Sequence, residues 1–184
     1  LSLIRFLLGQ SAVLSANLWI IKPPNERTLH LHSDAAGITL GAGQIAHVAN
    51  ASWLCTDYED ADDGPTVLVP GSFRFGRGTL PHESDPLDTP FPVVPLQGKA
   101  GSLAIWHGGT WHGSIPRRRD GLRITLAQNW MRSYMKQIHQ WDDAPADLLE
   151  RYPELKHILG LDSYFPYGEN PNPDGKFILT SIEP

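Results

Sequence analysis

The chain has 184 residues, 41% of them hydrophobic, which is enough to build one sizeable core in a single domain. Its formal charge of −5 argues against partners such as nucleic acid or an anionic membrane surface. A single cysteine, Cys55, excludes an internal disulfide and favours a reducing, cytoplasmic location.

The predicted elements begin with residues 1–8, which read as the end of an amphipathic helix. This stretch is too short to span a bilayer, and Arg5 interrupts it. Short β-rich runs follow, separated by Pro, Gly or acidic turn residues. We place the strands at residues 12–21, 28–34, 46–56, 66–69, 91–96, 102–106 and 122–130.

The last of these strands has two different faces. One carries the polar or small residues Arg123, Thr125, Ala127 and Asn129, and the other is mainly apolar. A strand with one face toward a hydrated interior and the other in a packed apolar layer is typical of a small barrel or sandwich that holds a ligand.

After residue 130 the pattern changes. Residues 131–141 are compatible with a helix, and spaced apolar residues predict one or two short helices within 145–160. The stretch from Asp162 onwards is rich in Pro, Gly and Asn and is expected to be an irregular tail over the barrel. We therefore predict one domain over residues 1–184, with a barrel core at about 12–130 and a helical and irregular part at 131–184.

His32 and Asp34 indicate a metal site. They are two residues apart, so on a β-strand both side chains would project from the same face. A distant histidine, His112, would complete a two-histidine, one-carboxylate set. Such a set leaves Fe(II) with open positions for oxygen chemistry. A 2-oxo acid can fill two of these positions and dioxygen the third.

Other histidines compete for these roles. His30 shares the expected face with His32 and Asp34, so any two of the three could bind, and we favour His32 because it forms the His-x-Asp pair. His107 competes with His112, but its neighbours fit the end of a strand better than a ligand position.

The distal carboxylate of a 2-oxo acid needs a fixed cation, and Arg123 is the candidate. Arginine suits this role because its planar fork pairs with both carboxylate oxygens. Thr125 shares a strand face with Arg123, so its hydroxyl could hold the same carboxylate. Asn17, on the first strand, could also reach the co-substrate pocket.

The order of several short motifs resembles the phytanoyl-CoA dioxygenase family. The motifs are His32-Ser33-Asp34, Trp53-Leu54-Cys55-Thr56-Asp57, residues 63–72, residues 101–106, Trp111-His112-Gly113-Ser114 and residues 122–125. The resemblance implies a mainly β double-stranded β-helix, a jelly-roll or cupin-like barrel, with flanking helices. It also implies a non-haem oxygenase that uses Fe(II), 2-oxoglutarate and dioxygen to hydroxylate or otherwise oxidise a small organic molecule.

The same resemblance implies site residues. His32, Asp34 and His112 would bind iron, while Arg123 and Thr125 would hold 2-oxoglutarate. Asp34 favours hydroxylation, because relatives that halogenate have a small residue at that position.

Two departures from the family pattern stand out. Phe73 follows the Pro-Gly-Ser turn where the family usually has His, and the N-terminal segment of most members is expected to be missing here. The alternatives are a cupin-like metalloenzyme that uses His30 as well and no 2-oxoglutarate, or a degenerate barrel that acts as a binding module. The sequence leaves the primary substrate and the oligomeric state open.

Overall fold

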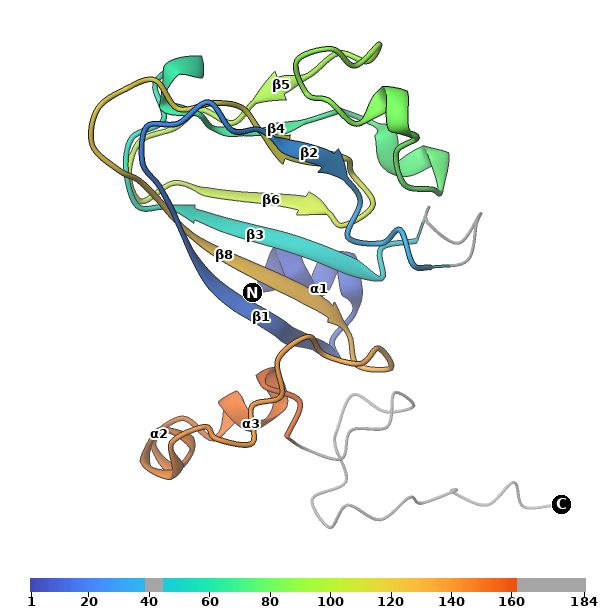
Figure 1. Cartoon of the computed structure of the whole chain (residues 1–184). Coiled ribbons are helices and arrows are strands. Elements are labelled where there is room, and N and C mark those ends of the chain that lie inside the picture. Colours follow the sequence, from blue (N-terminus) through green and yellow to red (C-terminus); the bar gives the residue numbers. More distant parts are fainter. Residues whose placement is uncertain (39–44, 162–184) are drawn as a thin grey trace, which may run out of the picture.

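Two four-stranded antiparallel sheets form the body of the protein in this computed structural model, which describes residues 1–38 and 45–161 (Figure 1). The larger sheet has the order β1 (Ala12–Lys22), β8 (Arg123–Arg132), β3 (Val48–Leu54) and β6 (Leu103–His107). The smaller has the order β2 (Leu29–His32), β7 (His112–Ser114), β4 (Thr66–Leu68) and β5 (Val94–Pro95). This alternation between two sheets is the double-stranded β-helix, or jelly roll, expected from the sequence.

The helices are short and flank the sheets. They are α1 (Ser2–Leu8), α2 (Ala146–Arg151) and α3 (Glu154–Ile158), with 3-10 turns η2 (Ala61–Asp63), η3 (Ser72–Phe75) and η4 (Pro81–Glu83). The predictions of helix at residues 1–8 and within 145–160 are confirmed. Within residues 1–38 and 45–161, no helix has the length and apolar character needed to cross a membrane.

The apolar core lies mainly on the outer sides of the two sheets. Ile4 and Leu8 of α1 pack with Leu14, Ala49 and Trp130 of the larger sheet. On the smaller sheet a second cluster contains Leu31, Val67, Val69 and Trp111. Because these clusters bury apolar surface away from the space between the sheets, that space is left for polar side chains and a ligand.

The helix predicted at residues 131–141 is wrong. Strand β8 continues to Arg132, and the residues after it lie against a bulge in β1 between Leu14 and Ala16. The side chains of Gln137 and Trp141 donate hydrogen bonds to the Leu14 carbonyl, at 2.7 and 2.9 Å. These long-range bonds hold the segment in an irregular path, which its apolar spacing does not reveal.

The strand predicted at residues 28–34 is shorter and less regular than expected. Strand β2 ends at His32, and its pairing with β7 is irregular between Leu29 and His32. Asp34 therefore lies in the turn after the strand and not on it. Strand β7 is a further three-residue element that was not predicted separately, and the predicted irregular tail lies outside the described residues.

Candidate metal centre and co-substrate pocket

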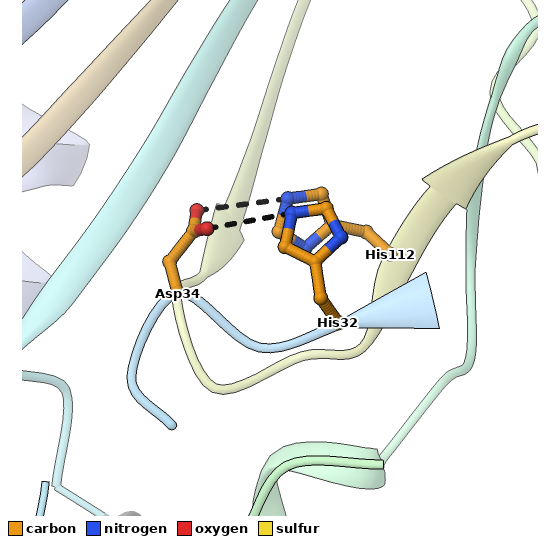
Figure 2. A group of neighbouring side chains, drawn as sticks. All are labelled: His32, Asp34 and His112. Carbon is orange, nitrogen blue, oxygen red and sulfur yellow. Dashed lines mark ion pairs between the residues drawn. The ribbon is translucent and has the colours of Figure 1, made fainter. Parts of the chain in front are cut away.

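Three side chains converge between the sheets to form a group suited to a metal ion. His32 Nε2 lies 3.6 Å from one carboxylate oxygen of Asp34, and His112 Nε2 lies 3.6 Å from the other (Figure 2). One potential ligand atom from each residue can be chosen so that all three lie within 4.8 Å of one another. The structure thus brings together the three residues proposed as ligands.

Backbone carbonyls fix which nitrogen of each imidazole faces Asp34. The Nδ1 atom of His32 lies 2.9 Å from the His30 carbonyl, and that of His112 lies 3.0 Å from the Thr110 carbonyl. A carbonyl only accepts, so each Nδ1 carries the proton and donates it. In the neutral ring, each Nε2 then presents its lone pair to the centre of the group, as a metal ligand must.

The Asp34 carboxylate is also held from the larger sheet. Asn50 on β3 donates a hydrogen bond of 2.6 Å to Asp34 Oδ2, and Asn129 on β8 donates one of 3.0 Å to Asn50 Oδ1. This chain of amides restrains a carboxylate that lies in a turn, where the backbone alone would hold it loosely.

His112 is buried, and its surroundings favour the neutral ring. Burial is the main cause that lowers the pKa of His112, while the nearby charge of Asp34 opposes this shift. A neutral imidazole is the form that binds a metal, so the ring needs little deprotonation before it can act as a ligand.

Close approach of β2 to β7 brings the two histidines together. A Cβ atom at Gly113 would lie 2.3 Å from the Leu29 carbonyl oxygen, so no side chain fits there. One residue before His112, the Trp111 ring is fully buried and its Nε1 donates to the Arg77 carbonyl at 2.9 Å. Glycine allows the approach and tryptophan anchors the strand.

The competing histidines lie outside this group. The ring of His107 stacks on Phe73 with centroids 4.8 Å apart, and its Nδ1 accepts a hydrogen bond from the Gly109 amide. His30 is exposed, with its Nδ1 3.5 Å from the Ser84 hydroxyl. Asp34 lies in the turn after β2, so the predicted strand face shared by His30, His32 and Asp34 does not form, and His30 is not in the group.

A cavity of about 260 Å³ extends from the three residues along the space between the sheets. Its lining includes His32, Asp34 and His112 at one place and Arg123 and Ser114 at another. The cavity therefore connects the candidate metal centre with the arginine proposed to hold a co-substrate.

Arg123 is buried in a position that leaves part of its hydrogen-bonding capacity unused. The side chain donates one hydrogen bond of 2.5 Å to the Gly64 carbonyl, and its guanidinium lies 5.5 Å from the centre of the Tyr58 ring. Its Nε atom is buried and has no hydrogen-bond partner among the described residues. Buried donors are normally satisfied, so this one indicates a missing acceptor.

A second cation lies beside Arg123. Lys22 pairs with Arg123 across β1 and β8, is largely buried, and donates to the Ser114 hydroxyl at 3.2 Å. Burial, Arg123 and Arg117 lower the pKa of Lys22 to about 8. Neither Lys22 nor Arg123 forms an ion pair with a carboxylate within the described part of the chain. Two buried cations without a counter-ion make a pocket for an anion.

The other two residues proposed for the co-substrate have different positions. Thr125 is buried on the inner face of β8, but its hydroxyl is hydrogen-bonded to Tyr58 and does not line the cavity. Asn17 does not line the cavity either, whereas its neighbours Ala16 and Leu18 do. The side-chain oxygen of Asn17 accepts a hydrogen bond of 3.4 Å from Gln128, which does line the cavity, and a role for Asn17 at the co-substrate stays a prediction.

Sequence reasoning did not propose Lys22, Ser114, Tyr58 or Asn50 as site residues. For Ser114 a signal existed, because residues two apart on a strand share a face and Ser114 follows His112 by two. The other three depend on pairings between distant strands, which the sequence alone does not specify.

Comparison with known proteins assigns the chain to a family. The sequence profile described as phytanoyl-CoA dioxygenase matches residues 2–125. The chain belongs to this family. The matched region contains every candidate ligand and co-substrate residue, namely Asn17, His32, Asp34, His112, Arg123 and Thr125.

The chain has low sequence identity to individual relatives. A dioxygenase named af480 from Aspergillus fumigatus is 27% identical to it over 164 residues, which are 88% of this chain and 52% of af480. The chain thus spans about half the length of that relative.

Solved structures share the fold at low identity. HygX from Streptomyces hygroscopicus, with nickel and 2-oxoglutarate bound, has a TM-score of 0.63 and 17% identity, covering 80% of this chain and 69% of HygX. The non-heme monooxygenase ThoJ, in its apo form, has a TM-score of 0.59 and 21% identity, covering 76% of this chain and 54% of ThoJ. At these identities the two likenesses establish the fold.

Proposed function

We propose that this protein is a dioxygenase that depends on Fe(II) and 2-oxoglutarate and oxidises a small organic molecule. The observation that carries the proposal is one cavity that joins a His-Asp-His group to a buried cationic pocket. Membership of the phytanoyl-CoA dioxygenase family supports it.

The donor set fits iron. Two neutral imidazole nitrogens and one carboxylate leave open positions on Fe(II), and bound Fe(II) would supply the activation of dioxygen that oxidation requires. His32, Asp34 and His112 would hold the ion. The carbonyls behind the two imidazoles and the amide of Asn50 keep these three donors in place.

The cationic pocket fits the distal carboxylate of 2-oxoglutarate. Arg123 offers a planar fork with an unused Nε donor, and Lys22 adds a second positive charge beside it. The Ser114 hydroxyl lines the same part of the cavity. These groups would bind and orient the co-substrate, so that its 2-oxo acid end points along the cavity toward His112. Tyr58 and Thr125 support Arg123 from behind.

The primary substrate would be a small molecule that enters the same cavity. HygX has been solved with hygromycin B bound together with nickel and 2-oxoglutarate, which shows that a related barrel accepts an organic substrate. For this chain we infer a hydroxylation or related oxidation.

The test is release of succinate from 2-oxoglutarate by the purified chain, with and without added Fe(II). We expect release that needs Fe(II), stops with a chelator and resumes when Fe(II) is restored. Zn(II) should not replace Fe(II), because a redox-inert ion does not activate dioxygen. Metal binding without 2-oxoglutarate turnover or binding would contradict the proposal and favour the cupin-like alternative.

A further inference from the structure

One part of the cavity is left over when the metal centre and the cationic pocket have been assigned. Lys22, Arg123 and Ser114 mark the end where the co-substrate carboxylate would lie. Leu29 pairs with Ser114, and Ile20 pairs with Thr125, so both aliphatic side chains belong to that end. They are suited to pack on the carbon chain of 2-oxoglutarate.

Leu18 lies further along β1. It is four residues from Lys22, or about 13 Å along a strand that rises roughly 3.3 Å per residue. Its side chain lines the cavity and is 58% exposed, and it pairs with Ala127 on β8. A five-carbon co-substrate anchored at Lys22 would leave this side chain uncovered.

Ile138 stands beside the same end of the cavity. Its backbone amide donates to the Ser15 hydroxyl at 2.9 Å, next to the β1 bulge, and its side chain is 73% exposed while lining the cavity. Two large aliphatic side chains, from β1 and from the segment after β8, therefore line an open part of the cavity. Exposed apolar side chains gathered at a cavity mark a ligand site more often than chance exposure.

Charge is missing from this part of the cavity. Apart from Asp34, Arg123 and the two histidines, every cavity-lining residue within the described part of the chain is uncharged. The remaining polar groups near Leu18 are amides and hydroxyls, on Ser52, Gln128 and Asn129. A charged substrate would gain no counter-charge here, whereas an aliphatic group would cover exposed apolar surface.

We propose that the primary substrate is an uncharged molecule whose aliphatic part packs on Leu18 and Ile138. This inference rests on the proposed function, because the metal and 2-oxoglutarate define which part of the cavity is free. A polar group on such a molecule would be met by the amides of Gln128 or Asn129.

The test compares three probes of equal chain length and different charge: 1-octanol, octanoate and octylammonium. Each is titrated by calorimetry into the protein with Fe(II) and saturating 2-oxoglutarate under nitrogen, so that Lys22 and Arg123 are already occupied and do not bind octanoate. We expect 1-octanol to bind at least about tenfold more tightly than either ion.

Matched variants locate the bound probe. Leu18→Gln and Ile138→Gln should each weaken 1-octanol binding by roughly tenfold. Ile21→Gln is the control, because Ile21 is 57% exposed on the same strand but does not line the cavity. It should leave the binding of 1-octanol unchanged.

Two results would overturn the inference: an ion that binds as tightly as 1-octanol, or 1-octanol binding that is lost in Ile21→Gln and kept in Leu18→Gln. Failure of the proposed function has a different signature, namely no Fe(II)-dependent succinate. A chain that selects 1-octanol through Leu18 but releases no succinate would keep the apolar site and overturn the oxygenase proposal alone.

Discussion

At the scale of single residues, variants of His112 and His107 test which of these two histidines binds the metal ion. Replacing His112 by Ala removes one of three proposed ligands and should abolish tight Fe(II) binding, whereas His107→Ala should retain it. The measurement is Fe(II) bound per chain after removal of free metal under nitrogen. Iron lost from His107→Ala and kept by His112→Ala would show that the proposed ligand set is wrong.

Variants of Arg123 distinguish co-substrate binding from metal binding. A charge-assisted hydrogen bond contributes roughly 1.5–3 kcal/mol, so Arg123→Leu should weaken 2-oxoglutarate binding by about tenfold to a hundredfold or more. Iron affinity should remain near normal. Arg123→Lys should restore only part of the loss, because lysine lacks the planar fork. Titration of each variant with 2-oxoglutarate checks this, and unchanged affinity in Arg123→Leu would refute the assignment.

The lowered pKa of Lys22 predicts how 2-oxoglutarate binding changes with pH. Its pKa in the folded protein is about 8, so the side chain is a cation below that pH and loses its charge as the pH rises through it. The affinity for 2-oxoglutarate should therefore be lower at pH 9 than at pH 7, and Lys22→Met should show a flatter profile. Equal slopes in the two proteins would exclude Lys22 from the pocket.

The pH dependence of folding stability that Lys22 causes has the opposite sign to its effect on 2-oxoglutarate binding. Between pH 8 and 10.5 the unfolded chain keeps the proton on Lys22 while the folded chain releases it. Because the unfolded state then binds more protons, the contribution of Lys22 to stability rises with pH over this interval. High pH should thus weaken co-substrate binding without weakening the fold through this residue.

At the scale of elements, the contact between β2 and β7 is the most sensitive feature. Gly113→Ala places a Cβ 2.3 Å from the Leu29 carbonyl, and because that atom is backbone, β2 must move away from β7. We expect a loss of roughly 1–3 kcal/mol in unfolding free energy and weaker metal binding, since His32 moves with β2. Gly37→Ala is the control, because no atom of residues 1–38 or 45–161 lies within 4 Å of its added Cβ. Denaturant unfolding of both variants gives the comparison.

The sequence predicts elements well where one pattern decides them. Alternation in β8 identified its polar inner face, and the His-x-Asp pair with the Trp-His-Gly motif identified three side chains that the fold brings together. In β1 alternation fails to decide, because Leu18 and Ile20 on one face are as apolar as Trp19 and Ile21 on the other. This pattern therefore does not decide on which face of β1 Asn17 lies.

Contacts between distant segments account for the other misses. The roles of Lys22 and Tyr58 depend on the pairing of β1 with β8 and on the loop that carries Tyr58. Likewise, residues 137–141 lose their expected helix to hydrogen bonds with β1 that no local pattern encodes. The strand order of a jelly roll makes such contacts frequent, because neighbours in a sheet are often far apart in the sequence.

At the scale of the whole molecule, ligand binding should appear as thermal stability. A ligand at a hundred times its Kd that binds only the folded state stabilises it by about 2.7 kcal/mol. For a domain of this size, that corresponds to a rise in Tm of roughly 5–10 °C. We expect such a rise when 2-oxoglutarate is added to the Fe(II)-loaded chain under nitrogen, and a rise at most about half as large in Arg123→Leu at the same concentration. An equal rise in both proteins would place 2-oxoglutarate elsewhere.

The bulge in β1 has a consequence for how this molecule behaves in solution. Strand β1 is the edge of the larger sheet (Figure 1), and an open edge can pair with the edge of another molecule and start aggregation. At one end of β1 the bulge gives the Leu14 carbonyl to Gln137 and Trp141. At the other end, Lys22 points inward and Pro23-Pro24 removes two amide donors. Within the described part of the chain only the middle of this edge stays open, which shortens the template for edge-to-edge assembly.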